Sequence, residues 1–126
     1  MRRFTEDEAP NVVTEVEFRE LIREGYAAEI VCEEDCDRRN NTWHGLWTMH
    51  ALHPFSSVAK PLVKYPRAMR DPLEQKLFRT VNGLVSFMEG CGFRSVHIPL
   101  KKGERTELSL DGRDCSGRHG GPASQD

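Results

Sequence analysis

Apolar and polar residues alternate along this chain with two different periods. Between residues 14 and 25 the apolar side chains recur at helical spacing, which predicts a short amphipathic helix. Thr14 is a suitable N-cap, Glu17 completes a capping box with it, and Gly25 supplies the stop. A helix of about three turns is not stable alone, so this one must pack against other elements.

The next forty residues change to period-two alternation, which predicts strands. Residues 26–32 form the first strand, and residues 33–41 form a polar loop whose Arg-Arg-Asn-Asn run has turn chemistry. Residues 42–52 form the clearest strand of the chain. Trp43 and Trp47 belong to the alternate set of side chains that we expect in the core.

The second half of the pattern predicts a third strand, a second helix and a last strand. Pro61 lies within the third strand, residues 58–65, and restricts it to an edge or a bulge, because proline cannot donate a ladder hydrogen bond. The run Asp-Pro-Leu-Glu from residue 71 predicts the start of a helix over residues 71–88. Residues 93–100 alternate again and predict the fourth strand.

The predicted fold class is α+β, in the order α-β-β-β-α-β. The four strands are expected to form a mostly antiparallel sheet with both helices on one face, because amphipathic elements bury their apolar sides in layers. Large apolar side chains are scarce outside the central part of the chain. We therefore expect a flexible acidic N-terminus over residues 1–13, a single domain over residues 14–102, and a disordered tail over residues 103–126.

Charge is distributed unevenly along the chain, although the net charge is only −2. Residues 1–40 hold 6 Lys and Arg against 12 Asp and Glu, whereas residues 41–102 hold 9 against 3. Such a split either gives the molecule two faces of opposite sign or is neutralised across the fold.

Four carboxylates in the predicted polar loop form the first candidate binding site. They belong to Glu33, Glu34, Asp35 and Asp37. We expect them at the tip of a hairpin, where they would contact a protein partner by imitating a strip of phosphates. Solubility of the hairpin and binding of a divalent cation are the alternatives, but the glycine and spacing of an EF-hand are absent.

Basic residues around the third strand form the second candidate site. Lys60, Lys64, Arg67 and Arg70 are the ones that would contact nucleic acid, because phosphate contacts require a high density of cations. No helix-turn-helix, zinc finger or aromatic RNA platform accompanies them. A solvated basic face is the alternative.

Cysteine and histidine residues leave a metal site open but do not predict one. A set of Cys32, Cys36 and His44 has ligand types suited to zinc, yet it lacks the matched second pair of a structural zinc site. We expect all four cysteines to be free thiols. No phosphate loop, nucleophile elbow or helix-borne His-Glu pair occurs, so we expect neither a cofactor nor catalysis.

The location of the protein follows from what the sequence lacks. No apolar run approaches the ~20 residues that span a bilayer, and the N-terminus has no apolar signal region. We expect a cytoplasmic protein without membrane partners.

Several short stretches resemble small accessory proteins of bacterial plasmids and other mobile elements. They are Asp35-Cys36-Asp37, the run Trp-His-Gly-Leu-Trp at 43–47, the run from Phe78 to Phe87, and Gly92-Phe93 leading to Ile98-Pro99. Members of this group are often labelled plasmid replication (RepB-type) or maintenance proteins. The resemblance covers about residues 30–100 and implies a protein that acts by binding; it assigns no functional residue.

We therefore expect a non-enzymatic binding protein of a mobile element. Its expected partner is a protein of nucleic-acid metabolism or defence, and inhibition of a defence system, as by anti-CRISPR proteins, is one form of this function. A direct DNA-binding protein in plasmid replication is the first alternative. A metal-dependent enzyme is the second.

Overall fold

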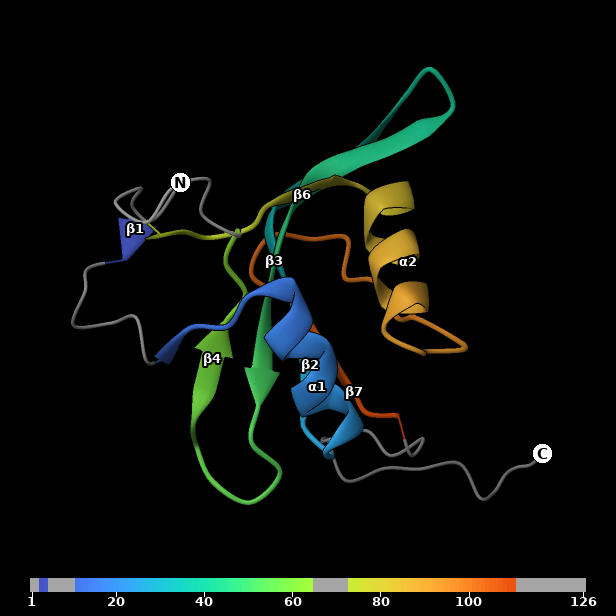
Figure 1. The fold of residues 1–126 in the computed structure, drawn as a ribbon. Coiled ribbons are helices and arrows are strands. Elements are labelled where there is room, and N and C mark those ends of the chain that lie inside the picture. Colours follow the sequence, from blue (N-terminus) through green and yellow to red (C-terminus); the bar gives the residue numbers. More distant parts are fainter. Residues whose placement is uncertain (1–2, 5–10, 65–72, 111–126) are drawn as a thin grey trace.

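The computed structural model of this chain describes residues 3–4, 11–64 and 73–110. These residues form two helices and seven strands in an α+β arrangement, which confirms the predicted fold class (Figure 1). In chain order they are β1 (Arg3–Phe4), α1 (Glu15–Arg23), β2 (Ala27–Arg39), β3 (Thr42–Leu52), β4 (Ala59–Pro61), β5 (Leu73–Glu74), β6 (Phe78–Thr80), α2 (Val81–Gly90) and β7 (Arg105–Leu108).

Antiparallel pairing joins five of these strands into one sheet. The order is β4-β3-β2-β7, and β6 also pairs with β3. Pro61 lies in β4, which is an edge strand as predicted. The sheet therefore has one strand more than the four that the sequence predicts. β1 and β5 form a separate two-stranded ladder.

Both helices pack on the same face of the sheet, as predicted. Phe18 of α1 and Phe87 of α2 lie with ring centroids 5.5 Å apart. They share one core cluster with Trp47 and Met49 of β3, which are completely buried. The capping box at Thr14 is present and begins α1 at the predicted place.

The second helix is shorter than the sequence predicts. Leu73–Glu74 and Phe78–Thr80 are strands, and α2 begins only at Val81. Thr80 caps it, since its hydroxyl oxygen accepts a hydrogen bond of 3.0 Å from Gly83 N. Phe78 instead pairs with Trp47 across the sheet, so tertiary pairing overrides the helical start signal. The predicted start at residues 71 and 72 lies outside the described residues.

The predicted last strand is also wrong. Residues 93–100 form no strand, because Pro99 lies among them and its carbonyl accepts a hydrogen bond of 2.8 Å from the indole of Trp47. A tight turn follows, closed by Glu104 N donating to Lys101 O, with Gly103 at φ +90°. The chain then enters the sheet as β7, so the expected disordered tail does not begin at residue 103.

Two parts of the N-terminal segment pair with other segments of the chain. Arg3–Phe4 pairs with Leu73–Glu74, and Val13 is buried and pairs with Leu62 in parallel. Residues 5–10 lie outside the described residues. None of the helices in the described part of the chain is long and apolar enough to cross a membrane.

Candidate functional site: a projecting hairpin arm

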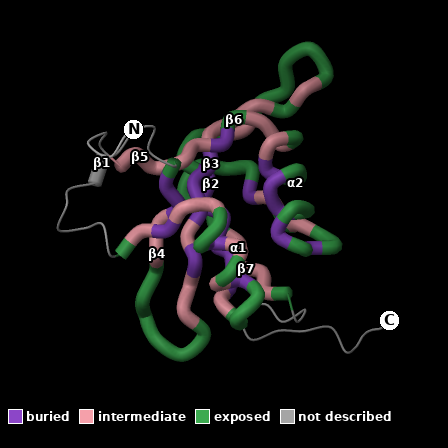
Figure 2. The backbone as a smooth tube through the Cα atoms, in the orientation of Figure 1, coloured by how far each residue is buried: buried purple, intermediate pink, exposed green. Residues whose placement is uncertain are grey.

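The hairpin of β2 and β3 continues well beyond the core. Residues 27–32 of β2 are all buried, whereas residues 33–39 are exposed except for the half-buried Cys36. β3 shows the same division, with its buried residues beginning at Trp47. Figures 1 and 2 show the outer end of this hairpin extending away from the rest of the chain. We call residues 33–46 the arm.

The arm is a two-stranded ribbon with a tight turn, not the polar loop that the sequence predicts. Asn40 and Asn41 have φ values of +52° and +64°, as the two central residues of a hairpin turn with this twist require. Arg39 pairs with Thr42 directly before the turn. Strand β2 therefore runs seven residues further than Cys32, where we expected it to end.

Two irregularities in β2 mark where the arm leaves the core. The register shifts by one residue between Cys32 and Glu34, and again between Glu34 and Asp37. Each shift places one extra residue in β2 against an uninterrupted β3, which is the pattern of a β-bulge. Bulges increase the local twist, so the arm leaves the sheet in a direction of its own.

Backbone hydrogen bonds hold the base of the arm in place. Cys36 N donates to Leu100 O at 2.8 Å, and Lys102 N donates to the Asp35 carboxylate at 2.7 Å. On the other side β6 pairs with β3, with Thr80 opposite His44. The arm is therefore attached on both edges over its inner part, as far as Cys36 and His44, and does not depend on its turn alone.

The four predicted acidic site residues line the arm but do not form its tip. The Glu33 carboxylate accepts a hydrogen bond of 2.7 Å from Thr48, and Asp35 holds the turn at Lys102. Asp37 forms an exposed ion pair of 3.4 Å with Arg39. All four residues are exposed on the outer part of β2.

The end of the arm carries residues that sequence reasoning assigned elsewhere. Trp43 was predicted in the core, yet 45% of it is exposed. Its strand alternation places it on the same face as Trp47, but the helices do not cover the sheet as far as the arm. Arg38 lies directly opposite Trp43, and Arg38 also donates to the side chain of Asn41. The Arg-Arg-Asn-Asn turn followed by Trp was the available signal for this site.

The predicted basic site lies partly outside the described residues. Lys60 is half-buried in β4, and Lys64 forms an ion pair of 3.6 Å with Glu74. Arg67 and Arg70 lie outside the described residues. The structure thus describes two of the four cations, and one of these two is already paired.

The cysteines near the arm contribute no assembled metal site. Burial raises the pKa of the Cys32 and Cys36 thiols, and the Cys32 thiol donates to Glu34 O at 3.0 Å. His44 lies further out, opposite Asp37. Within the described ranges no group of three His, Cys, Asp or Glu side chains could hold a metal ion.

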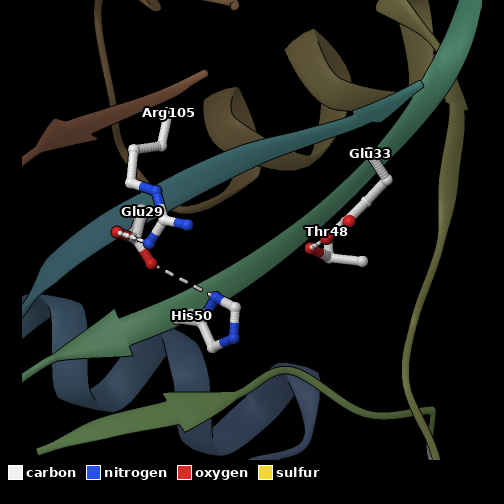
Figure 3. Close-up of polar contacts among 5 residues, drawn as sticks. All are labelled: Glu29, Glu33, Thr48, His50 and Arg105. Carbon is white, nitrogen blue, oxygen red and sulfur yellow. Dashed lines mark hydrogen bonds and ion pairs between the residues drawn. The ribbon is translucent and has the colours of Figure 1, made fainter. Parts of the chain in front are cut away.

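A second polar cluster, which the sequence does not predict, lies on the face of the sheet away from the helices. Glu29 is 5% exposed, and its carboxylate lies 3.3 Å from His50 Nδ1 and 3.2 Å from Arg105 Nη1 (Figure 3). The contact with His50, and then the charge of Arg105, hold the pKa of Glu29 below its ordinary value against the effect of burial. This cluster joins three strands and stabilises the sheet.

Comparison with known proteins identifies no relative. No protein-family model, no curated protein and no solved structure shows a significant match to this chain. The resemblance to mobile-element accessory proteins is therefore carried by the short stretches of sequence alone.

Proposed function

We propose that this protein is a non-enzymatic binding protein of a mobile element, and that the arm contacts a protein partner in the cytoplasm. The partner belongs to nucleic-acid metabolism or defence, the setting that the mobile-element resemblance implies. The observation that supports this proposal best is the exposed pair of Trp43 and Arg38 on a projecting arm. Tryptophan and arginine are the residue types that most often dominate binding energy at protein interfaces.

The attachment of the arm also favours a role in recognition. The hydrogen bonds at Cys36 and Asp35 and the pairing with β6 hold its base before any partner arrives. A surface that is already ordered loses less conformational entropy on binding, which favours affinity. Trp43 is not part of the core cluster, so its position is explained better by an external contact than by stability.

The charges of the arm favour a protein partner over nucleic acid. Residues 33–46 contain four carboxylates and two arginines, so the arm is acidic overall. A phosphate backbone is repelled by such a surface, whereas a basic nucleic-acid-handling protein is attracted to it. All four carboxylates of the arm are exposed to such a partner, although Glu33 and Asp35 also accept hydrogen bonds within the chain.

The proposal is tested by comparing variants as baits. The full chain, Trp43→Ala, Arg38→Ala and Phe55→Ala are immobilised and exposed to a lysate of cells that carry the gene, and the retained proteins are quantified. Phe55 is the matched control, since it is an exposed aromatic (92%) on the loop between β3 and β4, away from the arm. We expect a protein retained by the wild type and Phe55→Ala but lost with both arm variants. Equal retention on all four baits would contradict the proposal.

Direct DNA binding predicts a different result. A mobility shift with duplex and single-stranded DNA at about 0.1 M salt should show no complex at micromolar protein if the arm proposal holds. A tight, salt-sensitive shift that is lost when Lys60, Lys64, Arg67 and Arg70 are changed to Glu would instead establish the DNA-binding alternative.

A further inference from the structure

Strand β7 lies at the free end of the sheet order and pairs with β2 on one side. Gly103 N donates to Cys32 O at 2.8 Å, and Cys32 N donates to Glu104 O at 2.9 Å. These two bonds fix the phase of the ladder, because hydrogen-bonded and non-hydrogen-bonded pairs alternate along antiparallel strands. Thr106 and Leu108 therefore direct their backbone groups toward β2, and Arg105 and Glu107 direct theirs outward.

The outward edge of β7 has no backbone partner within the described residues. No bond outside the β2–β7 ladder involves the backbone of Arg105 or Glu107 there. Neither residue is buried. A row of outward N–H and C=O groups on an exposed edge strand is a template for pairing with another strand.

The side chains of β7 include a carboxylate, that of Glu107, for which the described residues supply no ion pair. Glu107 lies directly opposite Glu29 in the register, and like charges at opposed positions destabilise a sheet. Arg105 pairs with Glu29 at 3.2 Å. For Glu107 no ion pair forms within the described part of the chain. One carboxylate on this face thus lacks a cation beside it.

We propose that a second copy of this chain pairs with β7 through the same edge, in antiparallel orientation about a two-fold axis at Thr106. This register places Arg105 opposite the partner's Glu107, and Glu107 opposite the partner's Arg105. All four residues have outward backbone groups, so both pairs are hydrogen-bonded pairs of the new ladder. Each Glu107 gains a cation that the described residues of its own chain do not supply.

The charges of Arg105 and Glu107 favour this register over the two registers that differ from it by a slip of two residues. A slip by two residues in one direction would place Arg105 opposite its own copy, and a slip in the other would do the same for Glu107. Both place like charges directly opposite each other, which is unfavourable. Arg105 can serve Glu29 and the partner's Glu107 together, since its side chain is 58% exposed and a guanidinium has five donors.

Pairing of this kind joins the two sheets into one and is isologous, as in most symmetric dimers. The two-fold axis reverses the direction of β2 in the second copy. The two arms therefore lie at opposite ends of the joined sheet. This inference does not depend on what the arm binds, and its test reads the mass of the particle alone.

Sedimentation of the full chain and three variants tests the proposal at about 1–100 µM, the range in which micromolar association becomes visible. The wild type should approach twice the 14.4 kDa of one chain at the upper concentrations. Glu107→Arg should sediment as a monomer, because two positive charges then oppose each other across the edge. Within each chain the same change places a cation opposite Glu29, so folding is retained, which far-UV circular dichroism and a thermal melt check.

The swapped variant Arg105→Glu with Glu107→Arg restores opposite charges across the axis and should sediment as a dimer again. Glu20→Arg is the matched control, since it makes the same charge change at an exposed position of α1, and it should behave as the wild type. A wild type that stays monomeric at about 100 µM would overturn the proposal. So would a Glu107→Arg chain as dimeric as the wild type, or a swapped variant that remains monomeric.

Discussion

The inner and outer halves of the β2–β3 hairpin belong to the same two strands, yet they differ in burial. In the inner half, Ile30 lies opposite Met49 and Cys32 opposite Trp47, and all four side chains are completely buried. In the outer half, Arg38 lies opposite Trp43, and both residues are exposed. The ladder of hydrogen bonds continues through both halves. Backbone pairing alone therefore does not explain why the side chains are buried in one half and exposed in the other.

The two halves differ in the helices and strands that pack against them. The inner half has helices on one face and β4 and β7 on its edges, whereas the outer half has short contacts at its base only. Changes in the inner half should therefore alter the free energy of unfolding, and changes in the outer half should alter binding.

Removal of residues 103–126 should destabilise the inner half severely. A chain that ends at Lys102 lacks β7, which pairs with residues 28–31 of β2 and supplies Arg105 to Glu29. Loss of a paired strand exposes core side chains and leaves buried backbone groups unsatisfied. We expect the thermal transition to fall by well over ten degrees or to disappear, measured by circular dichroism; a melt within a few degrees of the full chain would show that β7 contributes little.

Trp47 and Trp43 should differ sharply when each is replaced by alanine. Trp47→Ala removes a completely buried ring and its bond to Pro99 O, and should cost about 3–5 kcal/mol of unfolding free energy. Trp43→Ala should cost less than about 1 kcal/mol, because much of that ring already contacts water. Urea denaturation measures both. Comparable losses would mean that the arm is part of the core.

The sequence predicts the inner half better than the outer half, for physical reasons. Alternation identifies Trp47, Met49 and the edge strand with Pro61, because burial on one face leaves a period of two. It also groups Trp43 with them, since the period does not reveal where the helices stop covering the sheet. For residues 33–41 the sequence predicts a polar loop. Two bulges in β2 between Cys32 and Asp37 interrupt the period of two that would indicate a strand there.

The sequence also does not predict segments whose structure depends on pairing with residues far away along the chain. β7 has one large apolar residue, Leu108, and becomes a strand because a turn at Gly103 delivers it to the edge of β2. The start signal at residue 71 predicts a helix from local chemistry, but Phe78 gains more from pairing beside Trp47. The cluster at Glu29 forms only when the register places His50 opposite it.

Glu29 should make the stability of the inner half depend on pH. Its pKa lies below the ordinary 4.5, so its contribution is fully present above that pH and is lost as the pH falls through the lower folded value. Glu29→Gln should destabilise the chain by about 1–3 kcal/mol at pH 7, since His50 and Arg105 lose a charged partner. The difference between wild type and variant should shrink as the pH falls from neutral through 4.5 and below, because the lowered pKa of Glu29 lies there. A difference that is constant over this range would assign the effect to packing.

The smallest effect is expected at the turn of the arm, where the outer half depends on local conformation alone. Asn41 has φ +64°, a left-handed conformation that asparagine adopts more readily than alanine. Asn41→Ala should therefore cost about 1 kcal/mol, and Asn41→Gly should cost nothing or stabilise slightly, because glycine has no Cβ. The two variants differ in turn preference and leave Trp43 and Arg38 in place. Urea denaturation should resolve them, and binding of the partner should weaken for the alanine variant only if the arm acts as a preorganised unit.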